Sequence, residues 1–170
     1  MNLVELSQIS PRILLDIRYA TANNFMGRSV YPSGSCFLLQ KTAERLHQVQ
    51  LNLEKRGLCL KVFDGYRPLS VQKILWQIFP NSPYIADPAI GSKHNRGAAV
   101  DLTLADRLMP SEFDEFTERA HHSYQGEPQE ALENRDILRR AMEAEGFIPY
   151  EEEWWHYDDP EWEKYPILDV

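Results

Sequence analysis

The sequence contains few cysteines. Its 170 residues include two, Cys36 and Cys59, and they do not form a C-x-x-C pair. Two cysteines are too few for a disulfide framework, and their spacing is not that of a redox motif. We therefore expect both to be free thiols that pack as small hydrophobic side chains, as is typical of proteins in a reducing cytoplasm.

Basic residues and long apolar runs are also scarce. The chain has 18 Lys and Arg against 26 Asp and Glu, a net charge of −8. This balance argues against nucleic acid and against an anionic membrane surface, because both need clustered basic residues. No run is long enough to span a membrane, and residues 1–11 lack the basic and apolar regions of a secretory signal. We therefore expect a cytoplasmic enzyme.

What remains is the composition of an ordinary globular protein, with 43% hydrophobic and 26% charged residues. The length fits one domain, residues 1–170, with a core of its own. Apolar residues recur at helical spacing in some segments and alternate with a period of two in others. Helices are predicted over 41–56, 68–79 and 128–145, and strands over 58–63, 98–104, 147–150 and 154–157.

The stretch Ser92–Leu104, S-K-H-N-R-G-A-A-V-D-L-T-L, carries the first candidate ligands. His94 and Asp101 lie seven positions apart, with Gly97 between them. The alternation after Gly97 predicts a half-buried strand whose polar face includes Asp101. Gly97 lets the preceding loop turn back and bring His94 close to that carboxylate. A ring nitrogen and a carboxylate oxygen that converge in this way are two zinc-type ligands that need a third.

The third candidate ligand is His156, in the sequence Glu153-Trp154-Trp155-His156. A catalytic zinc site usually has three protein ligands and a water, beside a carboxylate that accepts the proton of that water. His94, Asp101 and His156 are the predicted ligands, and Glu153 is the predicted base. Residues three apart point opposite ways on a flat strand, and the tryptophans favour a strand. We therefore expect a bulge or turn that brings Glu153 and His156 together.

Arg67 lies in Asp64-Gly65-Tyr66-Arg67-Pro68, directly after a predicted strand. One interpretation is a structural turn arginine paired with Asp64. The other is that Arg67 points at the metal, where its fixed charge stabilises the oxyanion of a tetrahedral intermediate, with Asp64 orienting it. Spacing alone does not separate the two.

Taken together, these motifs resemble the D-alanyl-D-alanine dipeptidases, the VanX-like family of zinc D,D-peptidases. The resemblance covers most of the chain. Its motifs are D-I-R-Y-A-T-x-N-N-F at 16–25, D-G-Y-R-P at 64–68, S-x-H-x-x-G-x-A-x-D-L-T-L at 92–104, F-D-E-F-x-E-R-A-H-H at 113–122 and E-W-W-H-Y at 153–157. It implies an α+β domain with a mostly antiparallel central sheet and helices packed on it, as in the hedgehog-type relatives of this fold. It also implies one zinc ion per chain and the hydrolysis of D-alanyl-D-alanine.

The resemblance also implies roles in substrate binding. Tyr19 would help to hold the dipeptide, and Asp114 would meet its free ammonium group. Ser92 and its neighbours would receive the carboxylate of the substrate. The sequence departs from the family in places, including the absence of a glycine before Phe113. Lys93 stands where a small polar residue is more usual, and the loop over 80–91 is shorter than expected, which makes the depth of the pocket uncertain.

Two other functions stay open at this point. The first is a zinc D,D- or L,D-carboxypeptidase that acts on peptidoglycan stem peptides, which would need a wider groove and usually an export signal. The second is a non-catalytic zinc-binding module of the same fold, which would have no use for Glu153 and Arg67 together. The only expected small partner is a dipeptide substrate, and a homodimer is one possible oligomeric state.

Overall fold

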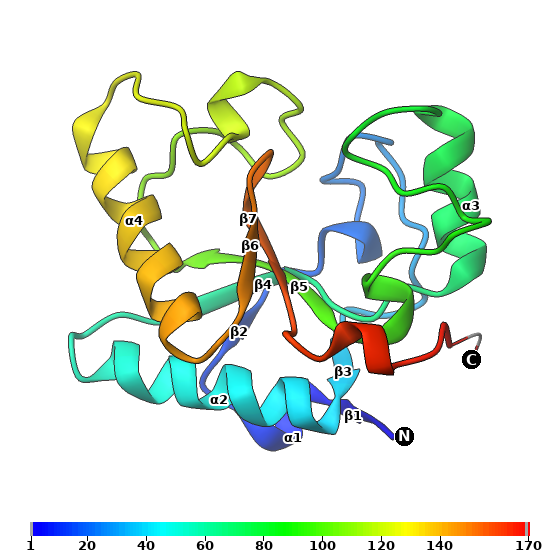
Figure 1. Ribbon diagram of the computed structural model, residues 1–170, viewed down its shortest axis with the longest axis horizontal. Coiled ribbons are helices and arrows are strands. Elements are labelled where there is room, and N and C mark those ends of the chain that lie inside the picture. The colour runs from blue at the N-terminus through cyan, green and yellow to red at the C-terminus, as the bar shows by residue number, and fades with distance from the viewer. Residues whose placement is uncertain (1, 169) are drawn as a thin grey trace.

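A five-stranded sheet in the order β2-β4-β5-β7-β6 forms the centre of the computed structural model, which describes residues 2–168 and 170 (Figure 1). Its strands are β2 (Leu14–Leu15), β4 (Leu60–Asp64), β5 (Ala99–Leu104), β6 (Ile148–Tyr150) and β7 (Glu153–Asp158). All neighbours are antiparallel except β2, which runs parallel to β4. The predicted α+β fold with a mostly antiparallel sheet is therefore confirmed.

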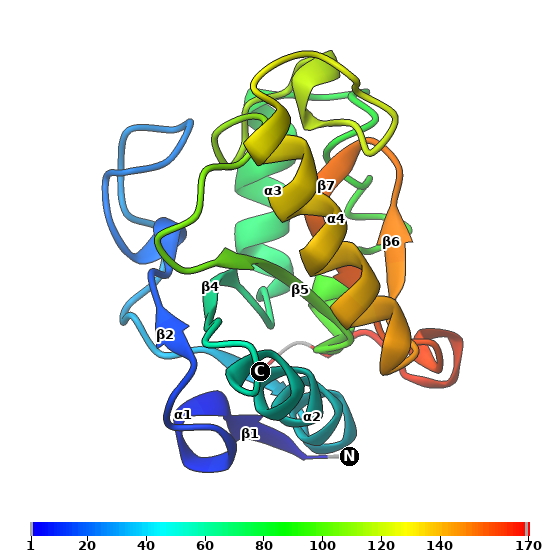
Figure 2. The ribbon, with the colours of Figure 1, turned by 90° about the vertical axis from the view of Figure 1, so that its left-hand side faces the viewer.

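Three long helices flank this sheet: α2 (Gln40–Glu54), α3 (Leu69–Ile78) and α4 (Gln129–Ala144). Each lies within two residues of its predicted range at both ends. Figures 1 and 2 place α2 and α4 on one side of the sheet and α3 on the other. No helix among the described residues is both long enough and apolar enough to cross a membrane.

A small separate sheet near the N-terminus escaped prediction. It pairs β1 (Leu3–Glu5) with β3 (Phe37–Leu39), and α1 (Leu6–Ile9) follows β1. The backbone of β3 also meets two segments of the main sheet region. The N–H of Tyr66 donates to the carbonyl of Phe37 at 2.7 Å, and the N–H of Leu39 donates to the carbonyl of Gly97 at 2.9 Å. Short 3-10 turns complete the chain: η1 (Arg18–Ala20), η2 (His94–Arg96), η3 (Glu118–Ala120) and η4 (Trp162–Lys164).

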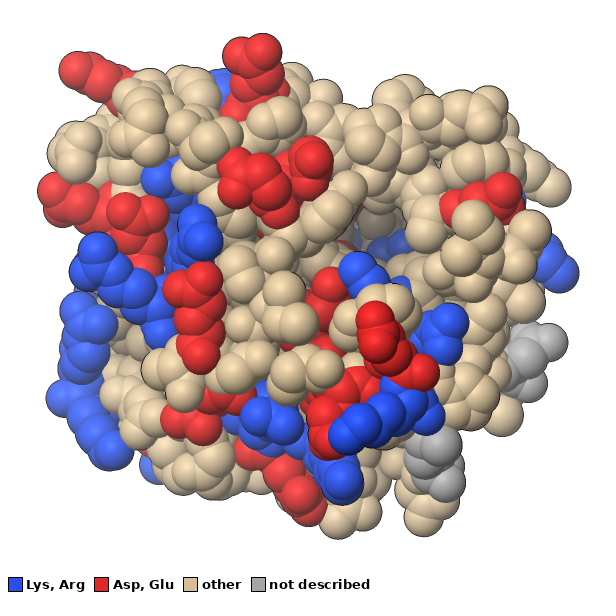
Figure 3. All heavy atoms as spheres, viewed as in Figure 1, with Lys and Arg blue, Asp and Glu red and all other residues tan. Residues whose placement is uncertain are grey.

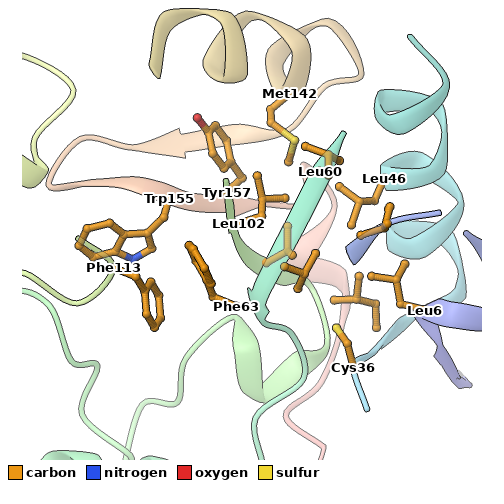
Figure 4. Close-up of a cluster of buried hydrophobic side chains, with 14 of the residues drawn as sticks. Leu6, Cys36, Leu46, Leu60, Phe63, Leu102, Phe113, Met142, Trp155 and Tyr157 are labelled. Atoms are coloured by element: carbon orange, nitrogen blue, oxygen red, sulfur yellow. The ribbon is translucent and has the colours of Figure 1, made fainter. Parts of the chain in front are cut away.

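The main core fills the space between the sheet and helices α2 and α4. Figure 4 shows Leu60 and Leu102 of the sheet beside Leu46 of α2 and Met142 of α4. All four side chains are fully buried. Burying a leucine-sized side chain contributes roughly 1.5–3 kcal/mol, so this layer holds β4 and β5 rigidly under the helices.

The prediction that β5 is half-buried is wrong. All six of its residues are buried, including the polar Asp101 and Thr103 on the face away from the core. The alternation correctly identifies which face is apolar. It does not reveal that loops and the end of the chain enclose the second face, so that this face is the floor of a cleft.

The last residues pack against the body of the domain. Tyr165 is buried in a small cluster with Leu39 and Ala98. The N–H of Leu168 donates to the carbonyl of Asn95 at 2.8 Å. The C-terminal segment therefore packs against the turn that carries His94 and helps to fix it.

Candidate active site

His94, Asp101 and His156 converge on one point, as predicted. The Nε2 atom of His94 lies 3.2 Å from Nδ1 of His156 and 3.3 Å from Oδ1 of Asp101. The Asp101 and His156 atoms lie 3.0 Å apart. All three side chains are buried, and their atoms form the one group of three or more potential metal ligands among the described residues.

Backbone geometry explains how two distant segments bring these atoms together. Asp101 of β5 and His156 of β7 are directly paired in the antiparallel register, which places their side chains side by side. His94 lies in the turn η2, and Gly97 ends this turn in the left-handed conformation with φ of 66°. A side chain at Gly97 would also collide with Leu3 and the backbone of Leu39.

Hydrogen bonds behind the ligands define which ring nitrogen of each histidine is free. The Nδ1 atom of His94 lies 2.8 Å from the carbonyl oxygen of Gly65, so it must donate and leaves Nε2 as the ligand atom. The Nε2 atom of His156 donates to Asp158 at 2.8 Å and leaves Nδ1 as the ligand atom. The two remaining ring nitrogens therefore face Asp101 and would offer their lone pairs to a metal bound there.

The three atoms fit a divalent metal such as zinc. In a tetrahedral site with bonds of about 2.0–2.1 Å, ligand atoms lie ~3.3 Å from one another, close to the observed separations. Two imidazoles and one carboxylate are also a suitable donor set. Burial alone would lower the pKa of His156, but Asp158 and Asp101 outweigh it and raise that pKa to about 10. The surroundings thus favour positive charge at this point.

Glu153 reaches the same point through the predicted bulge. The register of β6 and β7 pairs Pro149 with Tyr157 and Tyr150 with Glu153, so residues 154–156 have no partners on β6. The bulge places Oε2 of Glu153 3.7 Å from Nδ1 of His156. Burial raises the pKa of Glu153 to about 8. A carboxyl group with a pKa near neutrality can both accept and return a proton.

Arg67 lies beside Asp101 and is fixed on several sides. Its Nε and Nη2 atoms donate to Oδ2 of Asp64 at 3.0 and 2.7 Å, and its Nη1 donates to Gln72 at 2.9 Å. Nη2 also lies 3.9 Å from Oδ2 of Asp101. Asp64 in turn accepts a 2.7 Å hydrogen bond from Tyr31. The guanidinium is therefore held beside the ligand cluster, rather than exposed in a turn.

Tyr19 and Asp114 meet although they are 95 positions apart in the sequence. The hydroxyl of Tyr19 donates to Oδ2 of Asp114 at 2.8 Å. Asp114 has a left-handed backbone with φ of 60° and does not begin a helix. Burial raises its pKa to about 8. A half-buried carboxyl group with one hydrogen bond has remaining capacity for a cationic partner.

These groups share one cleft of about 750 Å³, and Figure 3 shows the molecule hollowed on this face. The predicted site residues that line it are Tyr19, Arg67, Ser92, His94, Asp101, Asp114, Glu153 and His156. Asp64 does not line the cleft, because it lies behind Arg67. Ser92 accepts a 3.2 Å hydrogen bond from the N–H of His94, so the serine is tied to the ligand turn.

The short loop over 80–91 nevertheless closes one side of the cleft. The ring of Tyr84 stacks on Phe116 with centroids 4.8 Å apart. The amide of Gln72 donates to the carbonyl of Ala86 at 2.7 Å, and Tyr150 donates to the carbonyl of Pro83 at 3.0 Å. These contacts hold the loop against the rest of the cleft.

Sequence reasoning missed four residues of the surrounding network. Tyr31 and Gln72 hold Asp64 and Arg67, and nothing in their local sequence indicates this. Asp158 could have been found, because it lies two residues after His156 on a strand and so shares its face. Lys93 stood out only as a departure from the expected pattern.

The adjacent His121 and His122, at the end of the 113–122 motif, lie outside the ligand cluster. His122 is not solvated but buried, and neither of its ring nitrogens has a hydrogen-bond partner among the described residues. Burial lowers its pKa to about 4. Its ring faces Tyr157, the neighbour of a ligand, with centroids 6.1 Å apart. Tyr157 belongs to the main core cluster, so His122 is part of the back of the sheet.

Comparison with known proteins identifies similar chains over the full length. The family model described as D-ala-D-ala dipeptidase, in the M15 group of peptidases, matches residues 1–167. The D-alanyl-D-alanine dipeptidase of Escherichia coli K12 is 36% identical over 172 residues, which cover 98% of this chain and 89% of that protein. The D-alanyl-D-alanine dipeptidases of Enterococcus faecalis and Enterococcus faecium are each 33% identical, and the matches cover 85% and 91% of this chain and 86% and 91% of those proteins.

Proposed function

Because the chain belongs to the D-alanyl-D-alanine dipeptidase family of the M15 peptidases, we propose that it is a zinc-dependent dipeptidase that hydrolyses D-alanyl-D-alanine. The observation that carries this proposal is the convergence of three ligand atoms within 3.3 Å of one another, with Glu153 and Arg67 in the same cleft. A base and an oxyanion donor beside a metal site are the parts that peptide hydrolysis needs.

His94, Asp101 and His156 are the proposed ligands. A zinc ion held there would act as a Lewis acid and lower the pKa of a water at the fourth position to about 7. Glu153 accepts the proton of the attacking water and returns it to the leaving amine. Its burial and its position beside His156 suit both transfers.

Arg67 stabilises the negative charge that develops on the carbonyl oxygen of the scissile bond. Its guanidinium is fixed in advance by Asp64 and Gln72, so no reorganisation is needed when the charge appears. Asp64 thus orients Arg67 and does not itself contact the substrate.

Asp114 and Ser92 are proposed to hold the two charged ends of the dipeptide. Asp114, supported by Tyr19, receives the ammonium group, and Ser92 with its neighbouring backbone receives the carboxylate. Both residues line the same cleft as the ligands, which supports recognition of a short substrate with unblocked ends. We further propose that residues 1–170 act as one dipeptidase domain in the cytoplasm. A homodimer remains a prediction that sedimentation analysis would test.

A panel of four peptides tests the proposal: D-Ala-D-Ala, L-Ala-L-Ala, N-acetyl-D-Ala-D-Ala and a pentapeptide stem, each with and without a metal chelator. We expect rapid hydrolysis of free D-Ala-D-Ala only, loss of activity with chelator, and recovery on addition of zinc. Cleavage of the stem but not the free dipeptide would favour a carboxypeptidase. Zinc binding without cleavage of any peptide would favour a non-catalytic module.

A further inference from the structure

Asp158 contacts the proposed ligand His156 on the side away from the other ligands. Its Oδ1 atom accepts a hydrogen bond from Nε2 of His156 at 2.8 Å. Asp158 is the last residue of β7 and is only 4% exposed. Because Nε2 carries the proton in this contact, the lone pair of the imidazole lies on Nδ1, which faces Asp101 and His94.

The second oxygen of Asp158 contacts Lys93. Oδ2 lies 2.8 Å from Nζ of Lys93, whose side chain is one-third exposed and lies over the ring of Trp162 at 5.0 Å. Lys93 directly precedes His94 in the sequence. One carboxylate therefore joins the segment that carries His94 to the strand that carries His156.

This arrangement differs from an ordinary surface ion pair, which contributes little to stability. The carboxylate is buried, and without Lys93 its charge would depend on the hydrogen bond from His156 alone. Leaving a buried charge without its partner is costly. The Asp158 carboxylate of this ion pair also accepts a hydrogen bond from the proposed ligand His156, so a change in the pair should alter the metal site.

We propose that Asp158 and Lys93 are positioning residues for the metal site. Asp158 holds His156 in the tautomer and orientation in which Nδ1 is the ligand atom, and Lys93 holds Asp158. This inference rests on the ligand set proposed above but does not depend on the identity of the substrate.

The expected effect is on metal affinity. A carboxylate that accepts the second N–H of a metal-bound imidazole makes the ligand more basic and fixes its ring, and losing such a partner typically weakens binding about 10- to 100-fold. Removing Lys93 should weaken binding less, because Asp158 would still contact His156. If Lys93 acts only through Asp158, the two effects should not add.

The experiment measures the zinc affinity of the purified full chain by competition with a chromophoric chelator, in the absence of peptide. The variants are Asp158→Asn, Lys93→Met and the double variant. Lys164→Met is the matched control, because it removes an ion pair with Glu161 in the neighbouring C-terminal segment that touches no proposed ligand. Visible absorption of the cobalt-substituted proteins reports the geometry at the metal.

We expect Asp158→Asn to weaken zinc binding about 10- to 100-fold and to change the cobalt spectrum. Lys93→Met should have a smaller effect in the same direction, the double variant should resemble Asp158→Asn, and Lys164→Met should bind like the wild type. Wild-type affinity and spectrum in both Asp158→Asn and Lys93→Met would overturn the inference. Lys93→Met keeps it testable if Asp158→Asn does not fold.

The outcomes separate this inference from the proposed function. A wild-type protein that binds zinc but cleaves no D-Ala-D-Ala, with weakened binding in Asp158→Asn, would refute the function and support the positioning role. Full dipeptidase activity in the wild type with unchanged zinc affinity in the variants would support the function and refute the positioning role. Absence of zinc binding by the wild type would overturn both.

Discussion

Two parts of the cleft are built in different ways. The metal floor consists of Asp101 and His156 on the paired strands β5 and β7, with His94 in the adjoining turn. The substrate wall consists of Tyr19, Arg67, Ser92 and Asp114, all of which lie outside the strands. The floor is positioned by backbone hydrogen bonds. The wall is positioned mostly by contacts between side chains.

This difference has consequences for mutation. A ligand on the floor cannot be replaced by a neighbour, because the strand register fixes which side chains meet. Residues of the wall are held by side-chain contacts that range from the single hydrogen bond of Asp114 to the three of Arg67, so the effects of losing them should be graded. Substitutions of the floor ligands should therefore abolish metal binding, whereas substitutions in the wall should reduce activity by different amounts.

The largest effects are expected at His156, a proposed ligand, and at Glu153, the proposed base beside it. Substitutions at these two positions should distinguish loss of the metal from loss of the chemical step. Glu153→Ala should retain about one equivalent of zinc and lose hydrolysis by several orders of magnitude, because only the proton acceptor is removed. His156→Ala should lose the metal itself. Measuring both the zinc content and kcat/KM of the two variants distinguishes the two kinds of loss. Turnover near that of the wild type in Glu153→Ala would show that Glu153 is not the base.

The next largest effect is expected in the wall, for Arg67→Lys. Lysine keeps the charge but cannot donate two hydrogen bonds to Asp64 and a third to Gln72. Removing one oxyanion donor typically costs about 10²–10³ in kcat, and we expect a loss of this order with unchanged zinc content. Loss of zinc from this variant would show that the floor and the wall are not separable.

A smaller effect is expected for Asp114→Asn, which should raise KM for D-Ala-D-Ala with little change in kcat. Hydrogen bonds to charged groups contribute roughly 1.5–3 kcal/mol, so the increase should be about 10- to 100-fold. Tyr19→Phe removes only the hydroxyl that contacts Asp114, so it should raise KM less than Asp114→Asn does. An unchanged KM in Asp114→Asn would mean that the ammonium group binds elsewhere.

The smallest effect on activity is expected for His122→Leu, behind the sheet, where neither part of the cleft is touched. Burial lowers the pKa of His122 from 6.5 to about 4, so the unfolded chain takes up the proton first. The stability that this histidine contributes is thus present above pH 6.5 and is lost progressively as the pH falls towards 4.

This loss in the free energy of unfolding is on the order of 3 kcal/mol for the wild type. His122→Leu should show a shallower decline in chemical-denaturation midpoint over this pH range and wild-type activity at pH 7. An equally steep decline in both proteins would assign the acid sensitivity to other groups.

The contrast between the metal floor, set by backbone pairing, and the substrate wall, set by side-chain contacts, also explains what could be predicted from the sequence. The three proposed ligands and Glu153 lie in short stretches where period-two alternation, a glycine and an E-x-x-H spacing indicate the local backbone conformation. The long helices follow from their apolar spacing. These features depend on neighbours in the chain, and the structure places them where they were expected.

Asp158 could have been placed beside His156 from their spacing, but the long-range contacts of the supporting network could not be predicted. The contacts of Tyr31 with Asp64 and of Lys93 with Asp158 join residues far apart in the sequence, and no local pattern indicates them. The enclosure of the second face of β5 likewise depends on loops and on the C-terminal segment. Period-two alternation reports which way a side chain points, but not what covers it.

Gly65 links the metal floor to the small sheet of β1 and β3. A methyl group on this glycine would lie 2.6 Å from Sγ of Cys36 and 2.8 Å from the carbonyl oxygen of Phe37, which is too close for either atom. Its own carbonyl sets the tautomer of His94. The small sheet of β1 and β3 contributes none of the proposed ligands, but its contact with Gly65 sets where the carbonyl group beside His94 lies. A methyl group at position 65 should therefore displace this carbonyl group and weaken metal binding at the proposed site, while the helices keep their positions.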